Sequence, residues 1–83
     1  MNLDEIKKKV KEIIISSLEL DLTPEEIDGN DLVNEIGINS IDALQIFVFI
    51  ESNFEFQIPD EDLNSDLLTS LDNLTEYIFK QIV

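Results

Sequence analysis

The sequence of 83 residues contains no cysteine and no histidine. Without cysteine the chain forms no disulfide and no zinc–thiolate site, and it has no thiol of its own. Without histidine it lacks the base that usually activates a serine nucleophile, and no Gly-x-Ser-x-Gly motif surrounds Ser40. These absences exclude thiol chemistry by the polypeptide and argue against serine hydrolysis.

Basic residues are scarce as well. The chain has 5 lysines and no arginine, against 19 acidic residues, and its net charge is −14. Four of the lysines lie between residues 7 and 11, and no base occurs from residue 12 to residue 79. Such a surface repels phosphate backbones and anionic lipids, and it attracts partners that carry Lys/Arg patches. The alternative is that the acidic excess only keeps a small domain soluble.

Long hydrophobic runs are also missing. The longest is Ile46–Ile50, far too short to cross a membrane, and the N-terminus lacks the basic-then-apolar order of a signal peptide. We therefore expect a soluble, cytoplasmic protein without membrane insertion. Residues 1–83 are expected to form one domain, near the lower size at which a single hydrophobic core suffices.

Apolar residues recur at helical spacing in three segments. The first predicts a helix over residues 3–18, opened by a capping box between Asn2 and Glu5. The second predicts a helix over about 40–53, although its β-branched and aromatic middle also resembles a strand. The last predicted helix starts near Thr69 or Ser70.

Two shorter signals lie between these segments. Thr23-Pro24-Glu25-Glu26 has an N-cap followed by proline, which predicts a short turn within a long structured loop. Pro59 precedes three acidic residues suited to the first turn of a short third helix. The fold class predicted is all-α, a four-helix bundle with a long loop between the first two helices.

The start of the second helix holds the most informative residue, Ser40. Two caps are possible there, because Asn39 has Asp42 three positions on and Ser40 has Ala43. The acid favours Asn39 as the cap and leaves the Ser40 hydroxyl uncommitted, beside the positive end of the helix dipole. A phosphate ester on that hydroxyl would be favoured. The alternative, a serine that simply caps the helix, stays open at this point.

Gly37-Ile38-Asn39-Ser40-Ile41 resembles the Gly-x-Asp-Ser-Leu motif of the acyl carrier proteins, whose serine carries 4′-phosphopantetheine. The resemblance covers nearly the whole chain. Its other segments are Asp42-Ala43-Leu44, Glu51, Phe54, Ile58-Pro59-Asp60-Glu61-Asp62 and Tyr77-Ile78.

The resemblance implies a freestanding carrier and not an enzyme. A holo-synthase, or phosphopantetheinyl transferase, would move 4′-phosphopantetheine from coenzyme A to Ser40. The thiol of this cofactor would hold acyl intermediates as thioesters for basic-patched acyl-processing enzymes, in a specialised fatty-acid, lipid or polyketide pathway. A monomer is the simplest expectation for such a carrier. The alternative is an unmodified acidic helical module for protein interaction.

The resemblance also implies a docking surface on the second helix, where the family uses acidic residues around an apolar stripe. This helix has more apolar residues than one face of a small bundle buries, so we expect the stripe to be exposed. The partner-binding residues that match are Asn39, Ile41, Asp42, Leu44, Val48 and Glu51.

Four residues depart from the family pattern. Asn39 replaces the usual Asp, and Gln45 and Ser52 stand where fatty-acid carriers are commonly acidic. Phe49 stands where a small residue is frequent near the hydrophobic pocket, so it is expected to reshape the acyl cavity. We interpret the uncharged residues Asn39, Gln45 and Ser52 as signs of a specialised carrier with its own enzymes.

One segment resembles part of a metal site. Asp28-Gly29 with Glu35 six residues after the glycine is similar to the second half of an EF-hand loop, but Pro24 falls at the first ligand position of that loop. We therefore expect no metal centre.

Overall fold

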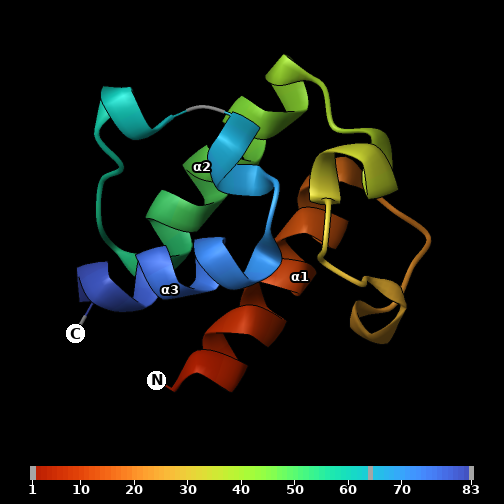
Figure 1. The fold of residues 1–83 in the computed structure, drawn as a ribbon, viewed down its shortest axis with the longest axis horizontal. Coiled ribbons are helices and arrows are strands. Elements are labelled where there is room, and N and C mark those ends of the chain that lie inside the picture. The colour runs from red at the N-terminus through yellow and green to blue at the C-terminus, as the bar shows by residue number, and fades with distance from the viewer. Residues whose placement is uncertain (1, 64, 83) are drawn as a thin grey trace.

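The computed structural model describes residues 2–63 and 65–82, and every regular element within those ranges is helical. Three α-helices, α1 (Leu3–Leu18), α2 (Ser40–Phe54) and α3 (Leu71–Ile82), are joined by segments that contain short helical turns. Figure 1 shows α3 lying across α1, and α1 packs against both other helices. The predicted all-α architecture is confirmed.

Helix α1 begins at the predicted capping box. Asn2 Oδ1 accepts a hydrogen bond of 2.8 Å from Glu5 N, and Asn2 N donates one of 3.1 Å to Glu5 Oε1. Both bonds satisfy backbone or side-chain groups that the first helical turn would leave unpaired. The apolar stripe faces inward, and Ile6, Val10 and Ile14 are fully buried. The helix spans the predicted residues because its start signal and its periodicity agree.

The long loop after α1 is fixed to the core at several points. The predicted turn is a 3₁₀ helix, η1 (Pro24–Glu26), and Ile27 and Leu32 after it are buried. Leu32 N donates to Thr69 O at 3.0 Å, which ties the loop to the segment before α3. A π-helical turn, η2 (Val33–Gly37), was not predicted, because five residues are too few to show a helical period.

The region after Pro59 contains two turns where one short third helix was predicted. The first is a 3₁₀ helix, η3 (Asp60–Asp62), and the second is another, η4 (Ser65–Leu68). Helix α3 starts at Leu71, slightly later than predicted. Ser70 Oγ accepts a bond of 3.3 Å from Asn73 N at this start.

Helix α2 has one buried and one exposed face. Its inward residues are Ala43, Ile46, Phe47, Ile50 and Phe54. The preference for a helix over a strand in this apolar segment is confirmed. None of the described helices is long and apolar enough to cross a membrane.

Candidate functional site

The first turn of α2 is set by the Asn39 cap. Asn39 Oδ1 accepts a hydrogen bond of 2.8 Å from Asp42 N, and Asn39 N donates one of 3.4 Å to Asp42 Oδ2. The capping box predicted for Asn39 and Asp42 is therefore confirmed. Because Asn39 serves as the cap, Ser40 is the first residue of the helix and not its cap.

The Ser40 side chain is exposed, and nothing in the ranges 2–63 and 65–82 forms a hydrogen bond with its hydroxyl. The hydroxyl stands at the N-terminal end of a helix of 15 residues, where unpaired N–H groups and the helix dipole favour negative charge. This position suits a serine that receives an anionic group from another molecule.

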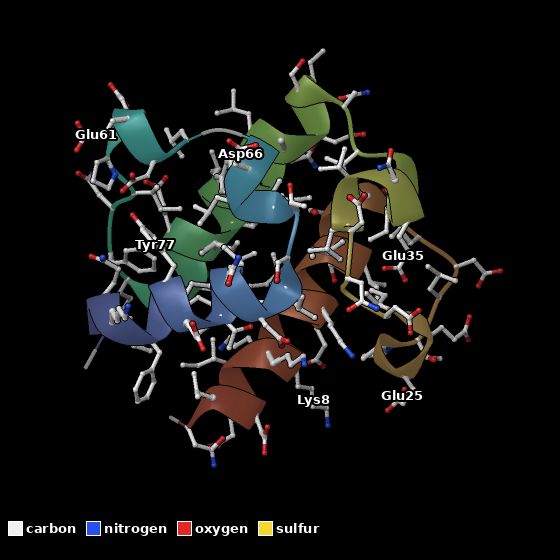
Figure 2. The ribbon with its side chains drawn as sticks, viewed as in Figure 1. Lys8, Glu25, Glu35, Glu61, Asp66 and Tyr77 are labelled. Atoms are coloured by element: carbon white, nitrogen blue, oxygen red, sulfur yellow. The ribbon has the colours of Figure 1, made fainter. Side chains whose placement is uncertain are left out.

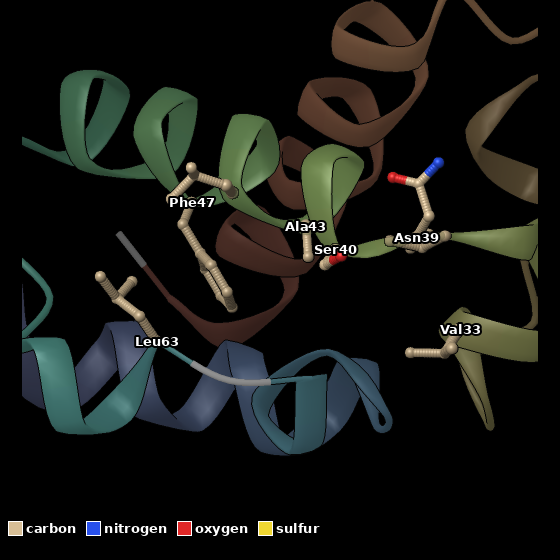
Figure 3. A pocket seen from close by; sticks show the side chains of 8 residues that line it. Val33, Asn39, Ser40, Ala43, Phe47 and Leu63 are labelled. Atoms are coloured by element: carbon tan, nitrogen blue, oxygen red, sulfur yellow. The ribbon is translucent and has the colours of Figure 1, made fainter.

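A pocket of about 470 Å³ opens directly beside Ser40. Figure 3 shows Phe47 reaching toward Leu63, with Ala43 between Phe47 and Ser40 along α2. Most of the lining is apolar, and the lining residues are Val33, Ile38, Asn39, Ser40, Ala43, Leu44, Phe47 and Leu63. An apolar group attached near Ser40 could therefore enter this pocket and leave water.

The stripe predicted to be exposed on α2 is exposed. Ile41 retains 77% of its accessible surface, Leu44 retains 56% and Val48 retains 53%. Apolar side chains that are this exposed to solvent and close together on one helix are typical of a protein-binding surface.

The two acidic residues predicted to flank this stripe form bonds within the chain. Asp42 accepts the Asn39 N–H described above, and Glu51 Oε2 accepts a hydrogen bond of 2.7 Å from Ile58 N. Glu51 thus fixes the segment that leads from α2 to Pro59. Sequence reasoning missed this second role, because residues 51 and 58 are joined by a turn whose path the sequence does not reveal.

Gln45 makes a further contact that sequence reasoning missed. Its Nε2 donates a hydrogen bond of 2.7 Å to the main-chain oxygen of Ser17, near the end of α1. Only a donor can satisfy a carbonyl oxygen, so an amide fits this position and an ionised carboxylate does not.

Phe49 does not line the pocket beside Ser40. It is 41% exposed, and it lies in a separate groove of about 310 Å³ with Ile13, Ser16 and Asn53. Residues 47 and 49 point to different sides of a helix because each residue turns by about 100°. The expectation that Phe49 shapes the cavity is therefore wrong, and the aromatic residue in the pocket is Phe47.

Tyr77 on α3 holds the turn that follows Pro59, and Figure 2 shows it on the same side of the molecule as Glu61. Its hydroxyl donates a hydrogen bond of 2.8 Å to Asp62 Oδ2. Burial, this hydrogen bond and the negative charges of Asp62 and Glu61 together raise the pKa of Tyr77 to about 12.

Glu35, labelled in Figure 2, has a structural role in the long loop. Its carboxylate accepts hydrogen bonds of 2.7 Å from Asp28 N and 3.0 Å from Gly29 N. Within the residues that are similar to half of an EF-hand loop, the backbone N–H groups of Asp28 and Gly29 thus bond to the side chain of Glu35.

Comparison with known proteins gives matches over most of the chain. A family model described as "Phosphopantetheine attachment site" matches residues 8–78. The chain is 31% identical over 80 residues to an "Acyl carrier protein" of Chlorobium phaeobacteroides, covering 93% of this chain and 95% of that protein. It is 29% identical over 77 residues to an "Acyl carrier protein" of Bdellovibrio bacteriovorus, covering 92% of this chain and 94% of that protein.

A eukaryotic relative matches over a shorter range. The chain is 32% identical over 68 residues to a "Putative acyl carrier protein, mitochondrial" of Schizosaccharomyces pombe. That alignment covers 81% of this chain and 59% of the relative.

Proposed function

Because the chain belongs to the acyl carrier protein family, we propose that Ser40 is its attachment site for 4′-phosphopantetheine and that residues 1–83 act as one carrier domain. Proteins of this family are carriers and not catalysts. The single observation that carries the proposal is an exposed serine without a described hydrogen-bond partner, at the first position of α2, inside the matched range.

The residues around Ser40 fit the phosphate end of this cofactor. Asn39 already caps the helix, so attachment at Ser40 Oγ does not remove a bond that stabilises α2. The negative charge of the phosphodiester would lie at the positive end of the helix dipole. Asp42, the nearest acid on α2, is held by Asn39 N in the capping box.

The chain supplies the attacking oxygen and little else to the attachment step. Ser40 Oγ would form a bond to the phosphorus of coenzyme A that bears the pantetheine arm, and the pyrophosphate bond would break to release adenosine 3′,5′-bisphosphate. No described residue forms a hydrogen bond with the Ser40 hydroxyl, so the serine proton is expected to pass to a base of the transferase. Modification therefore depends on a partner enzyme.

When bound, 4′-phosphopantetheine supplies the thiol that holds acyl groups as thioesters. The pocket beside Ser40 supports a role in sheltering the apolar part of such cargo, because it is lined mainly by aliphatic side chains and Phe47. Leu63, from the segment before η4, stands opposite α2 across this pocket. The residues of this chain would then exclude water from the cargo while partner enzymes perform the chemistry.

We further propose that the carrier serves a specialised fatty-acid, lipid or polyketide pathway. The support is the set of departures at the cap of α2 and along the helix, where Asn39, Gln45 and Ser52 are uncharged. One of these departures, Gln45, joins α2 to α1, because its side chain donates a hydrogen bond to Ser17 O. Slow processing of the holo form by enzymes of general fatty-acid synthesis is expected. Processing at the rate of their usual carrier would overturn the specialisation.

The test of attachment is the intact mass after incubation with coenzyme A and a promiscuous phosphopantetheinyl transferase. We expect one phosphopantetheine on the unaltered protein and none on Ser40→Ala. Ser52→Ala is the matched control, because Ser52 is also an exposed serine of α2, and it should be modified normally. Mass gain on Ser40→Ala, or no gain on the folded unaltered protein, would refute the assignment.

A further inference from the structure

One wall of the pocket beside Ser40 belongs to a turn outside α2. Leu63, which directly follows η3, lines this pocket together with Phe47 of α2. Figure 3 shows Leu63 and Phe47 on the side of the pocket that lies away from Ser40. Residues 40 and 47 are about 10 Å apart along the helix, because each residue rises by about 1.5 Å. An acyl chain that enters from the Ser40 end therefore meets Leu63 last.

The three residues before Leu63 have no hydrophobic anchor. They are the consecutive acids of η3, and none of them is buried. Asp62 N donates to Pro59 O at 2.9 Å, which shapes the turn but does not attach it to a helix. Like charges on adjacent residues also repel each other. Hydrophobic burial thus contributes little to the position of η3, and charge opposes its compact form.

Tyr77 attaches this turn to α3. Its hydroxyl donates to Asp62 Oδ2 at 2.8 Å, across 15 residues of sequence. The pKa of Tyr77, which burial and the nearby acids raise to about 12, keeps the hydroxyl protonated at neutral pH. Both side chains are half-buried, so water can replace the bond when the turn moves outward. We call this bond the Tyr77–Asp62 latch.

We propose that the Tyr77–Asp62 latch determines how long an acyl chain the pocket beside Ser40 accepts. The inference rests on the proposed function and assigns Tyr77 and Asp62 as positioning residues, which act on the cargo through Leu63. While the latch is closed, Leu63 closes the far end of the pocket. A short chain is buried with the latch intact, whereas a longer chain displaces Leu63 and opens the latch.

The two effects are similar enough in size for the latch to select between chain lengths. Burial of one CH2 group raises the unfolding equilibrium constant of the loaded protein by about fourfold. A hydrogen bond to a carboxylate favours the closed turn by about ten- to a hundredfold. The latch therefore offsets the burial of about two to three CH2 groups.

The experiment compares forms of the protein that carry saturated acyl chains of increasing length. A promiscuous phosphopantetheinyl transferase loads Ser40 from each acyl-coenzyme A, and intact mass verifies one acyl-phosphopantetheine. Urea denaturation followed by circular dichroism then gives the unfolding equilibrium constant. In the unaltered protein this constant should rise by about fourfold per CH2 group up to a limiting length, and then stay level over about two to three further groups.

Fluorescence reports the latch directly. The chain has one tyrosine and no tryptophan, so its intrinsic emission comes from Tyr77. A hydrogen bond to a carboxylate quenches tyrosine emission, because the excited hydroxyl loses its proton to the acceptor. Emission should therefore rise beyond the limiting length, toward the level of Asp62→Ala.

Two variants remove the latch in different ways. Tyr77→Phe keeps the ring and removes the donor, and Asp62→Ala keeps the tyrosine and removes the acceptor. In both, the level region should disappear, so that the unfolding constant continues to rise over those two to three groups. Asp60→Ala is the matched control, because it removes one exposed acid from the same turn and should keep the level region.

A level region of unchanged length in Tyr77→Phe or in Asp62→Ala would overturn the proposal, and so would constant tyrosine emission across the acyl series. Loss of the level region in Asp60→Ala would also overturn it, because charge on η3 would then determine the limit. Circular dichroism of the unloaded variants verifies folding, and either latch variant suffices if the other does not fold. Absence of any mass gain would overturn the carrier function itself, whereas normal loading with an unchanged limit overturns the latch alone.

Discussion

Gly29 and Leu71 are in direct contact where the long loop meets α3. Leu71 N donates a hydrogen bond of 2.9 Å to Gly29 O, and a Cβ atom on Gly29 would lie 2.6 Å from Leu71 Cβ. Gly29 also has a φ of +86°, a conformation that other residues rarely adopt. The absence of a side chain at residue 29 thus lets the loop approach the first turn of α3.

Gly29→Ala should lower the free energy of unfolding by about 2 to 4 kcal/mol, because it adds a steric clash to a left-handed backbone. Gly37→Ala is the matched control. Its φ is +79° but nothing lies within 4 Å of the added Cβ, so it should cost only about 1 kcal/mol. Urea denaturation followed by circular dichroism measures both values. Equal losses in the two variants would show that the contact with Leu71 does not matter.

Substitutions of Asn39 test whether its side chain caps α2. Asn39→Ala should lower the free energy of unfolding by about 1 kcal/mol, because Asp42 N loses its acceptor. Asn39→Asp should preserve stability, since aspartate caps equally well and adds a favourable charge at the start of α2. Thermal denaturation compares the variants, and intact mass after transferase treatment shows that Asn39→Asp is still modified. Equal stability of Asn39→Ala and the unaltered protein would contradict the assigned cap.

The sequence was sufficient for the helices whose start signals agree with their periodicity. The boundaries of α1 and the Asn39 cap of α2 follow from capping boxes that act within four residues. Exposure of Ile41, Leu44 and Val48 could also be predicted, because α2 has more apolar residues than its inner face accommodates. Local rules thus describe the surroundings of Ser40 well.

Contacts between distant residues were beyond the reach of the sequence. Gln45 meets Ser17 across 28 residues, and Tyr77 meets Asp62 across 15 residues. Such pairs depend on how the helices cross, which no short motif encodes. The error about Phe49 is different, because the rotation of about 100° per residue already places residues 47 and 49 on different sides of α2. Only the neighbours of Phe49 on α1, Ile13 and Ser16, required the structure. The structure places Phe47 in the pocket beside Ser40 and Phe49 in a separate groove.

Tyr77 should titrate at an unusually alkaline pH. It is the only tyrosine of the chain, so the ultraviolet absorbance of tyrosinate reports its pKa, which should be about 12 in the folded protein against an ordinary 10.0. Because folding raises this pKa, the stabilisation is fully present below about pH 10 and is lost as the pH rises through about 12.

Asp62→Asn should lower the pKa of Tyr77 toward its ordinary value, because the negative charge is removed while an acceptor oxygen remains. Titration of the unfolded chain in urea provides the reference near pH 10. An unchanged midpoint in Asp62→Asn would show that Asp62 contributes nothing to the pKa shift.

Gln45 should not tolerate the acid that carriers of fatty-acid synthesis commonly have at this position. Gln45→Glu replaces the donor to Ser17 O with a carboxylate that repels this oxygen near the negative end of α1, so it should cost about 1 to 2 kcal/mol of unfolding free energy at neutral pH. Below about pH 4 the carboxyl group is protonated and can donate, and because folding raises its pKa the penalty should shrink there.

Ser52→Glu adds the same charge at another exposed position of α2 and should cost less than about 0.5 kcal/mol. Urea denaturation at both pH values decides the matter, since an equal cost in the two variants would mean that charge on α2, and not the bond to Ser17, determines the effect.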